Sequence, residues 1–381
     1  MNAGLYLHFP FCVSRCTYCD FNAYSGLGEE LKKRYLEALL IDIRASGAER
    51  DYRVQTVFLG GGTPSLYEAS EIERVLSACR ESFQMKAQEV TLEANPGTLT
   101  LEKLRGYRQA GVNRLSFGVQ TFRPELLASL NRVHTVEEVE EAVEWARQAG
   151  FDNLSLDLIY GLPGQSLEDW QSSLERALQK HPEHLSIYQL TVEPGTHLEA
   201  QIRTGEVVLP EENLMLTMDR WMRSRVRAAG LHRYEIANWC RPGFHSRHNR
   251  VYWRDRPYLG LGCGATGFVN GWRVRRILHP AAYCKAVEEG RVPVGTAERM
   301  GTEAAAKDAL MMGLRTCWGV NLQSLRKRFP AISLKRLRAA LGELPPQWLE
   351  FRDPWMRLSL KGADFASSVQ HHLMDRHLSR L

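Results

Sequence analysis

The sequence predicts an α/β fold, in which helices cover a parallel sheet and a small, mainly helical C-terminal domain follows. Six short apolar segments alternate with helical patterns over the first 190 residues, and several of them end in Gly, Pro or Asn. From residue 302 the pattern is largely helical. Strands that alternate with helices form parallel sheets through right-handed crossovers. Six strands are fewer than the eight of a closed barrel, so an open sheet and a partial barrel both fit.

The predicted strands and helices alternate regularly along the first half of the chain. The strands are short and either apolar or alternating, and they span residues 5–9, 54–59, 89–93, 114–119, 153–159 and 184–190. The helices place apolar side chains at helical spacing and span residues 29–46, 69–83, 101–110, 135–149 and 166–179. In both candidate architectures, ligands bind at the carboxyl ends of the strands.

The second half of the chain has a different pattern. A long helix is predicted over 211–230, then a short strand over 233–237 and an aromatic, glycine-rich and basic stretch over 239–276. The remaining elements are three helices, a small hairpin and a terminal helix, over 304–314, 322–329, 334–341, 348–360 and 365–381. We therefore expect three parts: a core over 1–235, an extension over 236–300 and a C-terminal domain over 301–381.

Length and composition exclude several classes of protein. With 381 residues, of which 44% are hydrophobic and 24% charged, the chain is neither disordered nor fibrous. No segment approaches the ~18 apolar residues of a membrane helix, and the N-terminus lacks the basic and apolar regions of a signal peptide. We therefore expect a cytoplasmic protein. The net charge of +5 is too small to predict a nucleic-acid partner.

Three of the eight cysteines lie close together, directly after the first predicted strand. Thiolates at Cys12, Cys16 and Cys19 can converge on one soft metal centre. A structural zinc site needs four ligands, whereas three suit a four-iron cluster with one iron left open. Zinc binding and a redox role of the thiols are the less favoured alternatives. The other five cysteines are scattered and are expected in the core: Cys79, Cys240, Cys263, Cys284 and Cys317.

Polar and glycine residues recur at the ends of successive predicted strands. A glycine-rich run (GGGTPS, 60–65) follows the second strand, and it lacks both the lysine of a P-loop and the G-x-G-x-x-G spacing. Glu93 and Asp157 are charges within apolar strands, where a charge is rarely buried without a partner, and one alternative is that either simply pairs with Arg114 or Arg132. Their recurrence at the same end of the sheet indicates a binding site.

The cysteine motif, with an aromatic residue before its third cysteine, resembles that of radical S-adenosylmethionine (SAM) proteins. Further segments are similar to the branch of oxygen-independent coproporphyrinogen dehydrogenases, and within it to heme chaperones: 6–12, 19–21, 60–65, 118–122 and 157–164. The resemblance covers essentially the whole chain. It implies a partial (β/α)6 barrel and a C-terminal domain like that of the dehydrogenase.

The resemblance also implies roles for individual residues. Cys12, Cys16 and Cys19 would ligate a [4Fe-4S] cluster, whose open iron would hold the amino and carboxylate groups of SAM. The positions expected to bind SAM are Tyr6, Gly61, Gly62, Thr63, Glu93, Gln120, Arg132 and Asp157. A reduced cluster could then release a 5′-deoxyadenosyl radical from SAM.

Two departures separate this chain from the dehydrogenases. Phe21 stands where they carry a further cysteine, and only eleven residues precede Cys12. Both departures favour a heme chaperone without dehydrogenase activity. The alternative is an oxygen-independent coproporphyrinogen III dehydrogenase that acts through the 5′-deoxyadenosyl radical, and the question whether the protein is an enzyme stays open. A plain iron–sulfur or zinc module is disfavoured by the glycine run and the polar strand ends.

A second motif, His248-Asn249-x-x-Tyr252-Trp253, resembles one associated with heme binding in the chaperones. An imidazole can ligate heme iron, and Tyr252 and Trp253 offer flat apolar surface. Nearby arginines could pair with the heme propionates. The alternative is a histidine packed in the core. The implied partners are heme and apo-hemoproteins; delivery to respiratory proteins implies transient membrane contact, and the family resemblance implies a homodimer.

Overall fold

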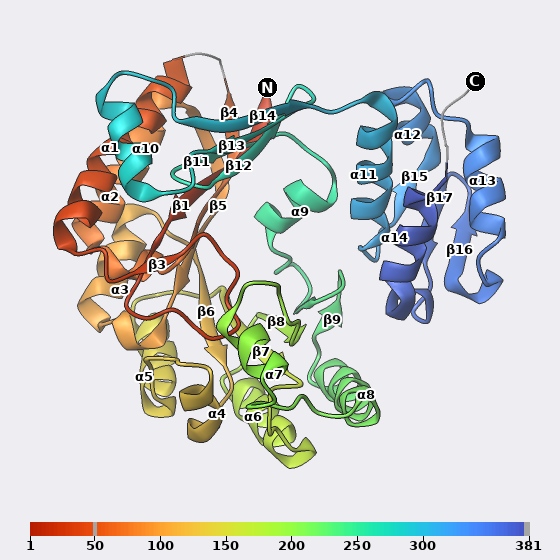
Figure 1. The fold of residues 1–381 in the computed structure, drawn as a ribbon, viewed down its shortest axis with the longest axis horizontal. Coiled ribbons are helices and arrows are strands. Elements are labelled where there is room, and N and C mark those ends of the chain that lie inside the picture. Colours follow the sequence, from red (N-terminus) through yellow and green to blue (C-terminus); the bar gives the residue numbers. More distant parts are fainter. Residues whose placement is uncertain (49–51, 377–381) are drawn as a thin grey trace.

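The computed structural model describes residues 1–48 and 52–376. Six parallel strands lie side by side in chain order: β1 (Asn2–Phe9), β4 (Arg53–Gly61), β5 (Gln84–Ala94), β6 (Arg114–Gln120), β7 (Leu154–Tyr160) and β8 (His184–Gln189). Helices cover one face of this sheet (Figure 1): α1 (Glu29–Ala48), α2 (Ala69–Ser82), α3 (Leu101–Ala110), α5 (Val136–Gln148) and α6 (Leu167–Gln179). The predicted α/β fold is therefore confirmed.

Alternation along the strands separates an apolar face from a polar one. In β5, Val90 and Leu92 belong to the hydrophobic core, and they alternate along the strand with Glu89, Thr91 and Glu93. Because successive side chains of a strand point to opposite faces, the helices cover the apolar face and the polar side chains face the interior of the curved sheet. This arrangement places carboxylates and hydroxyls on the concave side.

The helices begin at residues that satisfy their free backbone amides. Thr135 and Ser166 form capping boxes with Glu138 and Asp169 at the starts of α5 and α6. Gly111 ends α3 in the left-handed region, with φ of 105°. These local signals explain why the predicted helix limits agree with the structure to within a few residues.

The sheet is wider than the six predicted strands. It has twelve strands among the described residues, and its two edges remain apart, so the barrel is partial and open. Beyond β1 lie β11 (Tyr258–Leu261), β12 (Thr266–Val269), β13 (Trp272–Arg276) and β14 (Val294–Arg299), and beyond β8 lie β10 (Asn238–Cys240) and β9 (His232–Arg233). The predicted strand over 233–237 is wrong, because the chain turns between β9 and β10 and Arg233 donates to the carbonyls of Glu235 and Ile236.

Further helices complete this part of the molecule. They are α4 (Pro124–Ser129), α7 (His197–Arg203), α8 (Glu212–Ala228), α9 (Arg247–Trp253) and α10 (Pro280–Glu288). The helix α8 matches the predicted long helix. Figure 1 shows α9 between the sheet and the C-terminal helices. No helix in the described part of the chain combines the length and apolar character needed to cross a bilayer.

The C-terminal region is mainly helical, as predicted, and has a hydrophobic core of its own. Its elements are α11 (Thr302–Leu314), β15 (Val320–Asn321), α12 (Leu322–Arg328), α13 (Leu334–Gly342), β16 (Leu349–Arg352), β17 (Trp355–Leu358) and α14 (Ala366–Met374). Leu310, Leu337 and Met356 pack in this core. The predicted hairpin is confirmed as β16 and β17; residues 377–381 of the predicted terminal helix lie outside the described residues.

The scattered cysteines agree with prediction except at one position. Cys79, Cys240, Cys263 and Cys284 are buried. Cys317 is exposed, so the expectation of a core residue is wrong there. It follows the end of α11 in a turn, where its backbone amide donates to the carbonyl of Tyr234.

Candidate functional site

A cavity at the carboxyl ends of the parallel strands gathers nearly all the residues expected to hold the cluster and SAM. Its wall contains Cys12, Cys16, Cys19, Gly61, Gly62, Thr63, Glu93, Gln120, Arg132 and Asp157. These residues come from the loop after β1 and from β4 to β7 or the segments that follow them. The site therefore lies where ligands bind in this class of fold.

The cysteine loop is held from two sides. The hydroxyl of Thr63 donates to Cys12 Sγ at 3.4 Å, and Arg132 Nη1 donates to Cys16 Sγ at 3.4 Å. Asn131 lies just before Arg132, and its amide donates to Ser14 Oγ at 2.7 Å and to the Arg15 carbonyl at 2.9 Å. The segment between α4 and α5 thus fixes the shape of the loop that presents the thiols.

The three thiols suit an iron–sulfur cluster better than a single metal ion. Among the described residues, no three His, Cys, Asp or Glu side chains are close enough to hold one ion, whereas the thiolates of a cluster bind separate irons. Burial raises the pKa of Cys12, and it raises the pKa of Cys19 to about 11, so metal loading must displace protons from these thiols. When bound, a [4Fe-4S] cluster supplies one-electron chemistry and an iron that can chelate SAM.

The glycine-rich loop packs tightly against the cysteine loop. Gly61 has φ of 116°, and a Cβ there would lie 2.5 Å from the His8 ring. A Cβ at Gly62 would lie 3.0 Å from Cys12 Sγ. The left-handed backbone at Gly61 and the absence of a Cβ at both glycines allow β4 to end directly beside the thiols.

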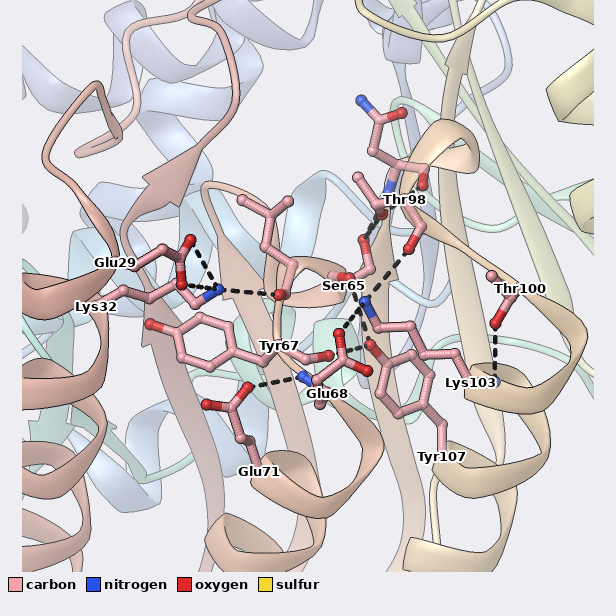
Figure 2. A network of polar contacts seen from close by, with 12 residues as sticks. Glu29, Lys32, Ser65, Tyr67, Glu68, Glu71, Thr98, Thr100, Lys103 and Tyr107 are labelled. Atoms are coloured by element: carbon pink, nitrogen blue, oxygen red, sulfur yellow. Dashed lines mark hydrogen bonds and ion pairs between the residues drawn. The ribbon is translucent and has the colours of Figure 1, made fainter.

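A polar network supports the other side of this loop, as Figure 2 shows. Ser65 Oγ accepts from the Asn95 backbone amide at 3.0 Å and contacts Thr98 Oγ1 at 2.6 Å. Lys103 Nζ donates to the Thr98 carbonyl at 3.3 Å and lies 3.4 Å from a carboxylate oxygen of Glu68. The network ties the ends of β4 and β5 together and keeps the glycine loop in place.

Two carboxylates face the cavity without a cationic partner. Burial and the neighbouring Asp157 raise the pKa of Glu93 to about 7, and its carboxylate accepts a hydrogen bond from the Gly61 amide at 3.0 Å. Burial also raises the pKa of Asp157, although Ser116 donates to it at 3.2 Å. Within the described residues neither carboxylate forms a direct ion pair, so the alternative of a pair with Arg114 or Arg132 is not realised, although the charge of Arg114 lowers the pKa of both. Both retain acceptor capacity for the amino or hydroxyl groups of a ligand.

Arg132 is the cation of the cavity that is best placed for an anionic ligand group. Its guanidinium donates to the Gly118 carbonyl and to Cys16 Sγ, while Nε is buried without a partner. An unpaired buried donor is rare and is compatible with a bound carboxylate. The residues of this cavity therefore fit SAM chemically, although their individual roles stay predictions.

Tyr6 differs from the other expected residues, because it is not part of the cavity wall. Its hydroxyl contacts His8 Nδ1 at 2.9 Å, and its ring stacks on Phe58 at 6.1 Å between centroids. The Tyr6 hydroxyl therefore contacts the same His8 ring that lies against Gly61. Several polar residues of the wall were not predicted, among them Ser14, Thr98, Ser116 and Asn131. Ser116 carried a signal, as it is a polar residue within an apolar strand.

The second motif lies on α9, where His248 is embedded among aromatic and polar groups. Its ring is fully buried, Nδ1 contacts Thr56 Oγ1 at 2.8 Å and Nε2 contacts the Tyr252 hydroxyl at 2.8 Å. Phe58 stacks on it at 5.2 Å, and burial lowers the pKa of His248 to about 3. Ligation of heme iron by His248 would require loss of at least one of these hydrogen bonds.

The residues of α9 point in different directions. At its start, the Glu89 carboxylate accepts from the backbone amides of Arg247 and His248, each at 2.8 Å. At its end, Trp253 borders a cleft that faces the C-terminal region, and its indole Nε1 is buried without a partner. The Asn249 backbone amide bonds to Ser246 Oγ as part of the helix cap. The motif therefore divides into an anchoring part and a part that faces the cleft.

Comparison with known proteins agrees with this site. The model of the radical SAM superfamily matches residues 6–177. The heme chaperone HemW of Mycobacterium tuberculosis is 37% identical over 97% of this chain and 94% of its own length. HemW of Bacillus subtilis is 37% identical over 85% of both chains.

A solved structure has the same fold. Coproporphyrinogen III oxidase (HemN) from Escherichia coli, described as a radical SAM enzyme, superposes with a TM-score of 0.84 over 97% of this chain and 89% of its own. At 22% identity this likeness concerns the fold alone. The HemW proteins, in contrast, share over a third of their residues with this chain along nearly its whole length, and the chain belongs to the HemW family within the radical SAM superfamily.

Proposed function

We propose that the protein is a heme carrier that holds a [4Fe-4S] cluster with SAM and transfers heme to apo-hemoproteins. The family relationship supports a chaperone, and one observation supports it over the dehydrogenase: the position of the arginines. The cluster cavity contains Arg15 and Arg132 together with two carboxylates. Coproporphyrinogen carries four carboxylates and would need more cations than this wall offers.

Arginines gather instead on α9 and the segment that follows it. Arg247, Arg250, Arg254 and Arg256 border a common cavity near the amino ends of β1 and β4. Heme carries two propionates, which this arginine-rich region could neutralise. The region lies at the opposite end of the sheet from the cysteine loop, because the cysteine loop follows the carboxyl end of β1.

We assign the motif residues separate tasks in this function. His248 and Tyr252 anchor α9 to the sheet, Asn249 belongs to its first turn, and Trp253 offers the flat surface. Axial ligation by His248 stays a prediction that a substitution can test. If His248→Ala retains full heme binding by absorbance titration, the ligand role is wrong.

The dehydrogenase alternative has a direct test. Anaerobically reconstituted protein is incubated with SAM, a reductant and coproporphyrinogen III, and the products are separated by chromatography. The proposal expects unchanged substrate alongside stoichiometric heme binding in a parallel titration. Protoporphyrinogen as product would refute a function restricted to heme transfer.

The homodimer, the transient membrane contact and the cytoplasmic location stay predictions of the same proposal. Size-exclusion chromatography with and without a reconstituted cluster tests the first of these. Sedimentation with liposomes that carry a hemoprotein client tests the second.

A further inference from the structure

A cleft of about 630 Å³ separates the segment after α9 from the C-terminal region. Residues 253–257 form one side, and α12, β17 and the turn after α11 form the other. The volume falls within the ~300–1,000 Å³ of typical small-molecule sites. The cleft therefore has room for a ligand of the size of a tetrapyrrole.

The walls of this cleft are rich in flat aromatic rings. Trp253, Trp318 and Trp355 all border it. Trp355 is 47% exposed, and Trp253 Nε1 is a buried donor without a partner. An exposed tryptophan ring and an unsatisfied indole donor are costly unless a ligand covers them.

Arg254 at the cleft and its neighbour Arg250 lie over an aromatic ring rather than beside a carboxylate. The guanidinium groups of Arg250 and Arg254 lie 4.9 and 5.6 Å from the centroid of the Trp318 ring. Burial and the charges of Arg250 and Arg256 lower the pKa of Arg254. In the described part of the chain neither Arg254 nor Arg256 forms an ion pair, whereas Arg328 pairs with Asp255 at 2.7 Å. Arg254 and Arg256, two positions apart in the chain, thus lack a carboxylate partner among the described residues and can bind two anionic groups.

The cleft contains no side chain that is a usual axial ligand of heme iron. Its walls hold no His, Cys, Met or Tyr among the described residues. The polar groups that remain are arginines, hydroxyls, an amide and the paired Asp255. A ligand in this cleft is therefore recognised by its ring faces and its charges rather than by a bond to its metal.

We propose that this cleft is the tetrapyrrole site of the protein, with the macrocycle against Trp253, Trp318 and Trp355 and the two propionates on Arg254 and Arg256. The inference rests on the proposed function and adds a location and a mode of recognition to it. Because the porphyrin ring and its carboxylates make the contacts, no residue of this cleft ligates the iron. A carrier of this kind releases heme without breaking an iron–protein bond at this site.

The test uses the full-length protein with its reconstituted cluster and three probes: hemin, metal-free protoporphyrin IX and protoporphyrin IX dimethyl ester. The inference expects hemin and protoporphyrin IX to bind within about tenfold of each other. The ester, which lacks the carboxylates, should bind about a hundredfold more weakly, since each lost charge-assisted contact costs about a factor of ten or more.

Substitutions locate the site. The double variant Arg254→Gln/Arg256→Gln should bind protoporphyrin IX about a hundredfold more weakly and should no longer distinguish the acid from the ester. Trp355→Ala, which removes an exposed ring, should weaken the binding of all three probes. Arg44→Gln, an exposed arginine on α1, is the matched control and should bind as the wild type does. Iron content and circular dichroism show whether each variant is folded.

The outcomes separate this inference from the function on which it rests. If the wild type binds no heme, the proposed function fails. If it binds heme but the double variant and Trp355→Ala bind protoporphyrin IX as the wild type does, the cleft is not the site and the proposed function stands. If protoporphyrin IX binds more than about a hundredfold more weakly than hemin, iron ligation supplies the affinity and this inference is overturned.

Discussion

Glu89→Gln is the perturbation that tests how the sheet positions α9. The Glu89 side chain is only 3% exposed, and its two oxygens accept the first free amides of α9 at 2.8 Å each. Hydrogen bonds to a charged group contribute about 1.5–3 kcal/mol, and glutamine keeps one acceptor oxygen while losing the charge. We therefore expect the substitution to reduce the free energy of unfolding by about 2 kcal/mol.

The same substitution should weaken heme binding while leaving the cluster loop untouched. Denaturant unfolding gives the stability change, heme titration the affinity and iron analysis the cluster content. Glu81→Gln, an exposed position on α2, serves as the matched control and should change none of these. An unchanged heme affinity in Glu89→Gln, together with the expected loss of stability, would refute the reasoning that α9 must be held in place for binding.

Three further predictions concern the cluster cavity. Single alanine substitutions at Cys12, Cys16 and Cys19 should each abolish iron–sulfur absorbance, and retention of iron in all three would contradict the cluster assignment. Because the pKa of Glu93 is raised from 4.5 to about 7 in the folded protein, the native state binds more protons over that range and stability falls as pH rises through it. Glu93 should contribute at most about 3 kcal/mol to the difference in the free energy of unfolding between pH 5 and pH 8, and Glu93→Gln should remove this contribution. An unchanged difference in Glu93→Gln would contradict the raised pKa of Glu93. Arg132→Lys should weaken SAM binding about tenfold by calorimetry with iron content retained, and unchanged affinity would remove Arg132 from the SAM site.

The regular part of the fold could be predicted from the sequence because its signals are local. Strand limits follow from short apolar segments, and helix starts follow from capping residues such as Thr135 and Ser166. The strands β11 to β14 were missed because each is short and rich in glycine or arginine. Only pairing with β1 and with one another makes such segments strands.

The candidate site was predictable where chemistry is concentrated in a motif. The spacing of the three cysteines and the run of glycines are enough to predict these residues as part of the site. Asn131 has no such signal, since its partner Ser14 is 117 positions away in the chain. The surroundings of His248 were equally hidden, because Thr56 and Phe58 reach it from another part of the sequence.

The partition of α9 shows why a motif alone does not define a binding mode. The sequence places His248 next to aromatic residues and arginines, which suggests an axial heme ligand beside the groups that contact the porphyrin and its propionates. In the structure, the histidine faces the sheet and the arginines of the following segment face the cleft. Tertiary packing therefore decides which residues of the motif meet a ligand.

Heme transfer is the measurement that tests the central claim most directly. Protein loaded with one equivalent of heme is mixed with an apo-cytochrome, and the absorbance of the two holo-forms is followed over time. The account predicts that heme leaves this protein and that the apo-cytochrome is loaded faster from it than from free heme at the same concentration. Heme that never binds, or that stays bound while the apo-cytochrome remains empty, would contradict it.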